Sequence, residues 1–234
     1  MALIDSCGEW PGAVEEAAFV DEGAGTGEGA RAVRRCATVA DAMGHGSRVA
    51  RLLTDGDAVF ELMLGQVFLG TWPASAVAVA AALDWAVAGG ANLIHMSLGL
   101  AADRAVLAAA ALRAIDAGCV VVASAPARGG VVYPAAYRGV IRGTGDARCG
   151  PGELSCLGPG FFGGCARWGV SGGEVRAVDV GAGASVGAAW VTRSLLAEPK
   201  PGSAREIIDR LTDKATYRGP ERRQRFPENR HPCD

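Results

Sequence analysis

Three residues of this chain belong to the types that together transfer an acyl group: a carboxylate, a histidine and a hydroxyl. Asp5 ends the apolar run MALID, His45 stands between two glycines in GHGSRVARLL, and Ser185 lies in GAGASVGAAWV at the start of an apolar helix pattern. A serine nucleophile needs a base that takes its proton, and the base needs a carboxylate that orients it. A fold that gathers these three side chains would hold the parts of a hydrolase.

The same residues also have simpler interpretations. Serine is a favoured N-cap, so Ser185 taken alone is better explained as a helix cap than as a nucleophile. The other two histidines are weaker candidates for the base. His95 lies inside an apolar strand pattern, where a hydrogen-bonded core histidine is expected, and His231 lies in the C-terminal tail. His45 remains as the base because its flanking glycines let the backbone approach closely.

The elements that must position these residues alternate along the chain. Strands are expected over residues 1–5, 58–68, 92–100 and 119–125, with a poorer strand or turn over 13–20. Helices are expected over 44–56, 74–90, 103–118, 185–198 and 203–215, the last with a capping box of Ser203 and Glu206. Strands separated by such helices form a parallel sheet that binds ligands at the carboxyl ends of its strands. Asp5, Ser97 and Ala125 fall at those ends.

Composition limits the classes of protein that remain. The chain has 234 residues, of which 50% are hydrophobic and 21% charged, with a formal net charge of -2, so neither nucleic acid nor an acidic membrane is an expected partner. No secretory signal and no uninterrupted membrane-spanning run is found, which predicts a cytoplasmic protein. One domain over residues 1–216 and a charged tail over 217–234 are expected.

Two further patterns carry weaker alternatives. The chain has seven cysteines, which are expected to be free thiols in a reducing cytosol, with Cys119 buried in the core. A disulfide bridge or a metal site at Cys149, Cys156 and Cys165 is the less favoured interpretation, and no metal is predicted. The glycine-rich segment GAGTGEGA (residues 23–30) could bind a nucleotide, but it lacks a preceding strand and a ribose-binding acid at the expected distance. A flexible linker is the better interpretation of that segment.

Five segments, taken in chain order, resemble the landmark segments of the subtilisin-like serine proteases: ALIDSC, GHGSRVARLL, LIHMSLGL, VVVASAPARGGVVYPAAYRGVI and GAGASVGAAWV. The family patterns are V-I-D-S-G, G-H-G-T-H-V-A, M-S-L-G, A-A-G-N followed by Y-P-A, and G-T-S-M-A. The resemblance covers about residues 2–215. It implies a three-layer α/β fold with a mostly parallel central sheet, no cofactor, and a catalytic triad of Asp5, His45 and Ser185. It also makes the nucleophile the better interpretation of Ser185.

The resemblance implies substrate-binding residues as well. The backbone of Ser97, Leu98 and Gly99 would pair with the substrate as an added strand, and the other wall of the specificity pocket would be formed by Ser124, Ala125 and Pro126. The backbone N–H of Ser185 would donate to the oxyanion. The position of the family's oxyanion asparagine is occupied by Ala127, so Arg128, Ser124 or another group would have to act as the second donor.

Other departures point to a narrow task. Arg48 stands where a second histidine is usual, and Trp190 stands near the usual Pro-His. No pro-region precedes Asp5 and no calcium-binding loop is recognisable, which suits folding in the cytosol. The chain is most similar to small intracellular members that trim leader peptides from modified precursors. Its expected partner is a peptide or precursor protein, with its modifying enzyme as a further candidate. A pseudoprotease that binds a peptide without cutting it stays open because of Ala127.

The tail adds one further alternative. It is basic and could dock the precursor or its modifying enzyme, although a solvated surface tail is the better interpretation; its arginines are Arg218, Arg222, Arg223, Arg225 and Arg230.

Overall fold

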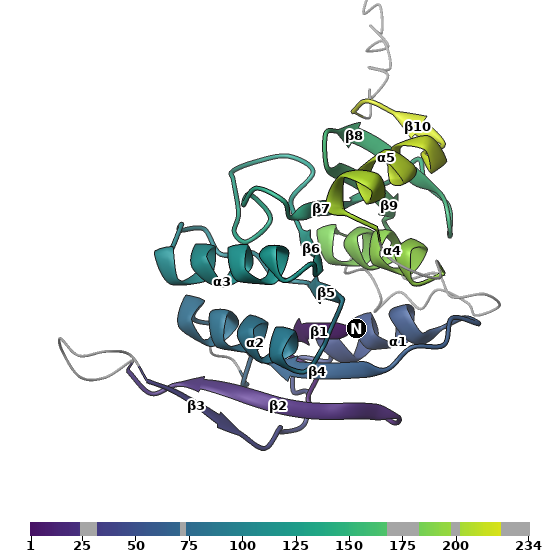
Figure 1. Cartoon of the computed structure of the whole chain (residues 1–234). Helices are drawn as coiled ribbons and strands as arrows, with labels where there is room; N and C mark the ends of the chain where they lie inside the picture. The colour runs from purple at the N-terminus through teal and green to yellow at the C-terminus, as the bar shows by residue number, and fades with distance from the viewer. Residues whose placement is uncertain (24–31, 71–73, 168–182, 198–201, 221–234) are drawn as a thin grey trace, which may run out of the picture.

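A computed structural model describes residues 1–23, 32–70, 74–167, 183–197 and 202–220 (Figure 1). These residues form one ten-stranded sheet between two layers of helices. The strands are β1 (Ala2–Asp5), β2 (Ala13–Asp21), β3 (Val33–Cys36), β4 (Leu62–Gln66), β5 (Leu93–Met96), β6 (Val120–Ser124), β7 (Ile141–Asp146), β8 (Leu154–Gly158), β9 (Phe161–Cys165) and β10 (Tyr217–Arg218). The helices are α1 (His45–Thr54), α2 (Ala76–Ala88), α3 (Ala105–Asp116), α4 (Ala184–Leu196) and α5 (Ala204–Lys214).

The strand order is β10-β8-β9-β7-β6-β5-β1-β4-β2-β3. All neighbours run parallel except the pairs β2/β3 and β8/β9. The parallel strands β1, β5 and β6 are adjacent, so their carboxyl ends meet at one edge of the sheet. The predicted α/β fold with a mostly parallel sheet is confirmed.

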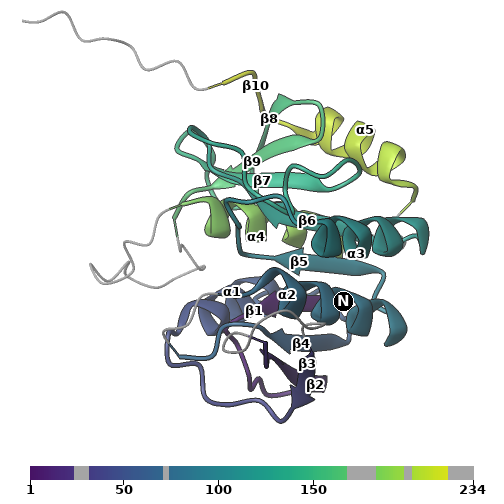
Figure 2. The same cartoon turned by 90° about the vertical axis from the view of Figure 1, so that its left-hand side faces the viewer.

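Two apolar cores cover the two faces of the sheet. Alternate residues of β1 point to opposite faces, so Ile4 packs in the core under α2 and α3, whereas Leu3 packs in the core under α1 and α4. Both side chains are fully buried, and each such burial stabilises the fold by about 1.5–3 kcal/mol. Figure 2 shows α2 and α3 over the sheet, with α5 beside β8.

Glycines allow α4 to lie directly on the sheet backbone. A Cβ added to Gly187 would collide with the carbonyl oxygen of Thr144 in β7, and a Cβ added to Gly164 in β9 would come within 2.6 Å of the Cβ of Trp190. No side chain therefore separates this part of α4 from β7 and β9. This close contact with the sheet explains why the GAGASVGAAWV segment is rich in small residues better than the helix propensity of those residues does.

Several elements were not predicted. The stretch from Gly129 onward contains β7, β8 and β9, whose glycine-rich sequences carry no clear alternation, and β3 is short and polar. Residues 13–20 form a true strand with an irregularity near its start. The capping box of α5 is present as predicted, with the Ser203 N–H donating to Glu206 Oε2 at 2.7 Å.

The C-terminal boundary remains a prediction. Tyr217 and Arg218 pair with β8, so the first residues of the expected tail belong to the sheet, and 221–234 lie outside the described residues. None of the helices in the described ranges has the length and apolar character needed to cross a bilayer.

Candidate active site

Asp5 and His45 form the centre of the site. Asp5 ends the central strand β1, and its side chain is fully buried. Its Oδ1 lies 2.8 Å from Nδ1 of His45 and accepts the backbone N–H of Ser6 at 2.6 Å. The second oxygen, Oδ2, is buried and has no hydrogen-bond partner in the described part of the chain. The carboxylate is therefore placed to orient the imidazole.

The first turn of α1 fixes the position of His45. Gly44 precedes the helix with φ at 62°, a left-handed conformation that favours glycine. Gly46 must also lack a side chain, because a Cβ there would collide with the backbone N of Cys7. The helix N-terminus is satisfied by Asp41, whose Oδ1 and Oδ2 accept the N–H groups of Gly44 and Ser47, each at 2.8 Å.

The surroundings of His45 change its pKa in opposite directions. Burial lowers the pKa, but the hydrogen bond and the negative charge of Asp5, together with Asp41, outweigh burial and the cation of Arg48. The net effect raises the pKa of His45 above its usual 6.5. The histidine side chain is 28% exposed, so it can reach a bound molecule. A base of this kind accepts a proton readily near neutral pH.

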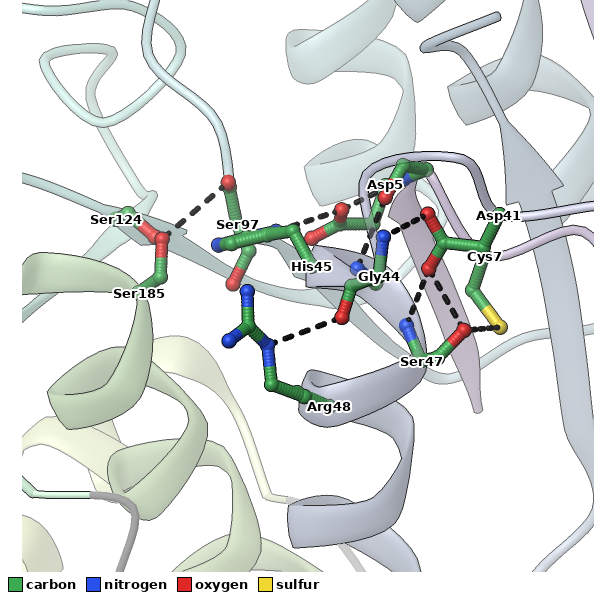
Figure 3. Close-up of polar contacts among 12 residues, drawn as sticks. Asp5, Cys7, Asp41, Gly44, His45, Ser47, Arg48, Ser97, Ser124 and Ser185 are labelled. Atoms are coloured by element: carbon green, nitrogen blue, oxygen red, sulfur yellow. Dashed lines mark hydrogen bonds and ion pairs between the residues drawn. The ribbon is translucent and has the colours of Figure 1, made fainter. Parts of the chain in front are cut away.

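Ser185 is the second residue of α4, and its hydroxyl does not cap the helix. The cap position is Gly183, which offers no side chain, so the capping interpretation is wrong. The hydroxyl donates to the backbone oxygen of Ser97 at 3.5 Å, a long hydrogen bond. Figure 3 shows the ring of His45 between Asp5 on one side and Ser97 and Ser185 on the other. No hydrogen bond joins Ser185 to His45 among the residues described, and such contacts are often long without substrate.

A buried chain of hydrogen bonds links α4 to the end of β5. Thr192 gives its only hydroxyl proton to Ala188 O at 3.0 Å, so its Oγ1 must accept the Nδ1–H of His95 at 2.7 Å. Nε2 of His95 then accepts the hydroxyl proton of Ser97, also at 2.7 Å. Burial, with a smaller contribution from the charge of His45, lowers the pKa of His95 to about 3, so its ring is neutral. The predicted core histidine is confirmed.

The segment Ser97, Leu98 and Gly99 follows β5 at the edge of the sheet. The side chain of Ser97 is used by His95, and Leu98 is buried in the core. Within the described residues, the backbone groups of Leu98 and Gly99 make no hydrogen bond. Beyond them, Leu100 and Tyr133 exchange two backbone hydrogen bonds of 2.7 and 2.9 Å. This segment therefore has free backbone N–H and C=O groups and is held in place at both ends, so an extended peptide can pair with it as an added strand.

The opposite side is formed by the end of β6. Ser124 is buried, and its hydroxyl donates to Met96 O over a long 3.4 Å. The N–H of Ala125 is used by Gly143 O at 2.8 Å, whereas Pro126 and Ala127 are exposed. Ala127 has only a methyl group, so it supplies no side-chain donor. Met96 of β5 lies opposite Ala123 of β6, and Ser97 and Ser124 are the next residues along the chain after each of them.

Sequence reasoning missed two polar residues that support the site. Gln66 is buried and accepts the N–H of Val39 at 2.9 Å, while its amide donates to Ser6 O and Val39 O, each at 2.8 Å. These bonds tie the loop before α1 to the segment that follows Asp5. Asp41 caps α1 as described above. Gln66 in the apolar run LMLGQVF was the available signal, because buried polar groups need partners.

The departures from the family pattern have local explanations. Arg48 donates from Nε to Gly44 O at 3.1 Å, and its positive charge lowers the pKa of His45. Trp190 is buried in the core under α4, and the guanidinium of Arg193 lies 5.1 Å from its ring centroid. Neither residue displaces Asp5 or His45.

The weaker alternatives receive no support from the described residues. Cys149, Cys156 and Cys165 are free thiols, and no group of three metal-ligating side chains occurs within the described ranges. Burial, followed by the charge of Asp146, raises the pKa of Cys149 to about 11, so it stays protonated. Of the GAGTGEGA segment, residues 24–30 lie outside the described residues, as do Arg222, Arg223, Arg225 and Arg230 of the tail.

Comparisons with known proteins give a fold and no family. No protein-family model matches the chain. No curated protein matches it either. A lanthipeptide protease structure is 15% identical, with 89% of this chain and 77% of that chain covered and a TM-score of 0.56. Sphericase is 18% identical, with 91% and 82% covered and a TM-score of 0.56.

A third structure is the subtilisin-like protease Apa1 from the Antarctic psychrotroph Pseudoalteromonas sp. AS-11. It is 20% identical with a TM-score of 0.45, and this chain spans only 34% of its length. The lanthipeptide protease and sphericase, whose TM-scores exceed 0.5, show the fold of this chain, which is the three-layer architecture expected from the five motifs.

Proposed function

We propose that this chain is a serine endopeptidase of the subtilisin type. The observation that carries the proposal is the hydrogen bond between buried Asp5 and His45 at the edge of the sheet where Ser185 begins α4. The fold shared with a lanthipeptide protease and sphericase adds to it.

The proposed reaction is acyl transfer in two steps. Ser185 Oγ bonds to the scissile carbonyl carbon while His45 Nε2 takes its proton, and His45 then gives that proton to the departing amine as the C–N bond breaks. Water, deprotonated by His45, then attacks the acyl carbon, and His45 returns this proton to Ser185 Oγ as the ester C–O bond breaks. Asp5 holds the Nδ1–H tautomer and stabilises the imidazolium without taking the proton.

The oxyanion would form at the N-terminus of α4. The backbone N–H of Ser185 lies in the first helical turn, where N–H groups have no intrahelical acceptor. Ser124 is the favoured second donor in place of Ala127, because its buried hydroxyl makes only a 3.4 Å bond to Met96 O and can be redirected at small cost. Arg128 is exposed and lines the cavity described below.

The proposed substrate is a leader peptide on a modified precursor protein in the cytoplasm. The resemblance to leader-trimming proteases supports it, and one of the similar structures is a lanthipeptide protease. Within this class, our finer proposal is the protease that removes the leader of the quinohemoprotein amine dehydrogenase small subunit. The missing asparagine at Ala127 fits an enzyme that is slow on general substrates and depends on docking of one partner.

A fluorophosphonate probe tests the nucleophile. We expect covalent labelling of the folded protein, with no labelling of Ser185→Ala and much weaker labelling of His45→Ala. Ser47→Ala, a nearby serine outside the proposed triad, is the matched control and should label fully. Absence of labelling in the folded wild type would exclude the serine protease.

A peptide-binding pseudoprotease is the second candidate. The observation that favours it is the hydroxyl of Ser185, which bonds to Ser97 O and makes no bond to His45 among the described residues. Candidate precursors incubated with the wild type and Ser185→Ala, and read by mass spectrometry, separate the two. Binding without cleavage in both proteins indicates the pseudoprotease, and cleavage by the wild type alone indicates the enzyme.

A further inference from the structure

A cavity of about 670 Å³ lies outside the triad, beside the loop between β6 and β7. In Figure 1 this loop lies between α3 and β7. The volume falls within the range of ligand sites, about 300–1,000 Å³. The cavity begins at Ala125, Pro126 and Ala127, which continue from the proposed wall of the substrate cleft. It therefore shares Ala125 and Pro126 with the proposed wall of the substrate cleft.

Among the residues that the structure describes, the cavity is lined by three arginines and by no acidic residue. Arg142 is held in place, because its Nη2 donates to Pro159 O at 3.0 Å and its guanidinium lies 4.8 Å from the ring centroid of Phe161. Arg128 and Arg138 are exposed, and neither forms a hydrogen bond or ion pair with another described residue. Three cations without a carboxylate partner favour a bound anion.

Apolar side chains complete the lining. They come from the loop, from β9 and from α5, and they are Val131, Val132, Val140, Phe161 and Ile208. The lining residue Tyr137 donates its hydroxyl to Asp103 at 2.9 Å, and Asp103 itself does not line the cavity. Charge and apolar surface together suit a peptide with an acidic side chain next to an apolar one better than they suit a small inorganic ion.

We propose that this cavity binds an acidic segment of the peptide substrate, with the carboxylate held by Arg142, Arg138 and Arg128. The proposal rests on the proposed protease function and deepens it, since it assigns the substrate class. Ala125 and Pro126 belong both to the proposed cleft wall and to the cavity lining, so an extended chain that passes this wall enters the cavity. The cavity would then select precursors by charge at a distance from the scissile bond.

A library experiment tests the proposal independently of cleavage. Immobilised Ser185→Ala protein is exposed to a randomised octapeptide library, and the retained peptides are sequenced by mass spectrometry. We expect enrichment of Asp and Glu, which is lost when all three arginines are changed to Gln. Arg51→Gln, an exposed arginine in the last turn of α1, is the matched control and should keep the enrichment.

Retained peptides are then compared as Glu and Gln pairs in cleavage by the active enzyme. Each Arg→Gln change should lower kcat/KM for the Glu peptide about three- to tenfold and leave the Gln peptide unchanged. Arg142→Lys should keep part of the preference, and circular dichroism checks that each variant is folded.

Three results would overturn the proposal. The first is no acidic enrichment, and the second is enrichment that survives in the triple variant. The third is binding of inorganic phosphate without peptide binding, because the occupant would then be a free oxyanion. Acidic enrichment together with no cleavage and no fluorophosphonate labelling would remove the protease function and leave the cavity assignment intact.

Discussion

His95 provides a stability test that does not depend on catalysis. Its pKa of about 3 in the folded protein lies below the ordinary 6.5 because of burial, so the unfolded chain binds a proton that the folded chain excludes. The stability contributed by neutral His95 is complete above pH 6.5 and is lost as the pH falls toward 3. Between pH 7 and pH 5 the expected loss is about 2 kcal/mol from this residue alone.

The substitution that isolates this effect is His95→Gln. Glutamine also offers an N–H donor for Thr192 Oγ1 and an oxygen that can accept the Ser97 hydroxyl, but it does not titrate. His45 has a raised pKa, so its contribution is complete below 6.5 and is lost as the pH rises through its folded value. That opposite contribution is present in both proteins and cancels when they are compared.

Urea unfolding, followed by tryptophan fluorescence, measures the difference. It is carried out in the Ser185→Ala background, where self-digestion cannot occur. We expect the parent to lose about 2 kcal/mol more than His95→Gln when the pH is lowered from 7 to 5. Equal losses in the two proteins would refute a neutral, buried His95. A second variant, His95→Leu, leaves the Ser97 hydroxyl without its partner and should cost about 1–3 kcal/mol at pH 7.

Three further predictions concern the site and its support. The acidic limb of the plot of kcat/KM against pH should lie above pH 6.5, because the pKa of His45 is raised. Arg48→Gln should move this limb to still higher pH, because it removes a cation that lowers the pKa of His45. A limb at lower pH in the variant than in the wild type would contradict this account. Ser124→Ala should lower kcat about 10- to 100-fold with little change in KM, and an unchanged kcat from steady-state kinetics would exclude it as oxyanion donor. Gly187→Ala should lower the free energy of unfolding by about 3 kcal/mol because its Cβ meets backbone, whereas Gly183→Ala, whose Cβ meets nothing within 4 Å, should be near neutral in the same urea assay.

The parts of the fold that could be predicted are those with strong periodic patterns. β5, β6 and the helices from α2 to α4 have long apolar runs, so their types and order follow from sequence. β8 and β9 could not be predicted, because the glycines of FFGGC break the alternation of polar and apolar residues. These glycines leave room for α4 and for the side chain of Ser155. Such strands are determined by the elements that pack on them, and the pattern of a single sequence does not contain this information.

The candidate site was predictable at its centre and not in its supports. Asp5 and His45 form a hydrogen bond, as the motifs imply, because the types of these two residues and the order of their segments are visible in the sequence. The roles of Asp41 and Gln66 depend on which loop crosses which strand, and that information arises only in three dimensions. The side-chain rotamer that joins the Ser185 hydroxyl to Ser97 O is also specified by no spacing in the sequence.

The position of β1 has a kinetic consequence. This strand lies between β4 and β5, with Ala2 opposite both Met63 and Ile94, and the nucleophile arrives much later in the chain on α4. Every contact that completes the site joins distant segments, and folds dominated by such pairings form slowly. Partly folded chains therefore contain Asp5, His45 and Ser185 without the assembled candidate site, and any catalytic activity should return during refolding only with the last phase of native fluorescence.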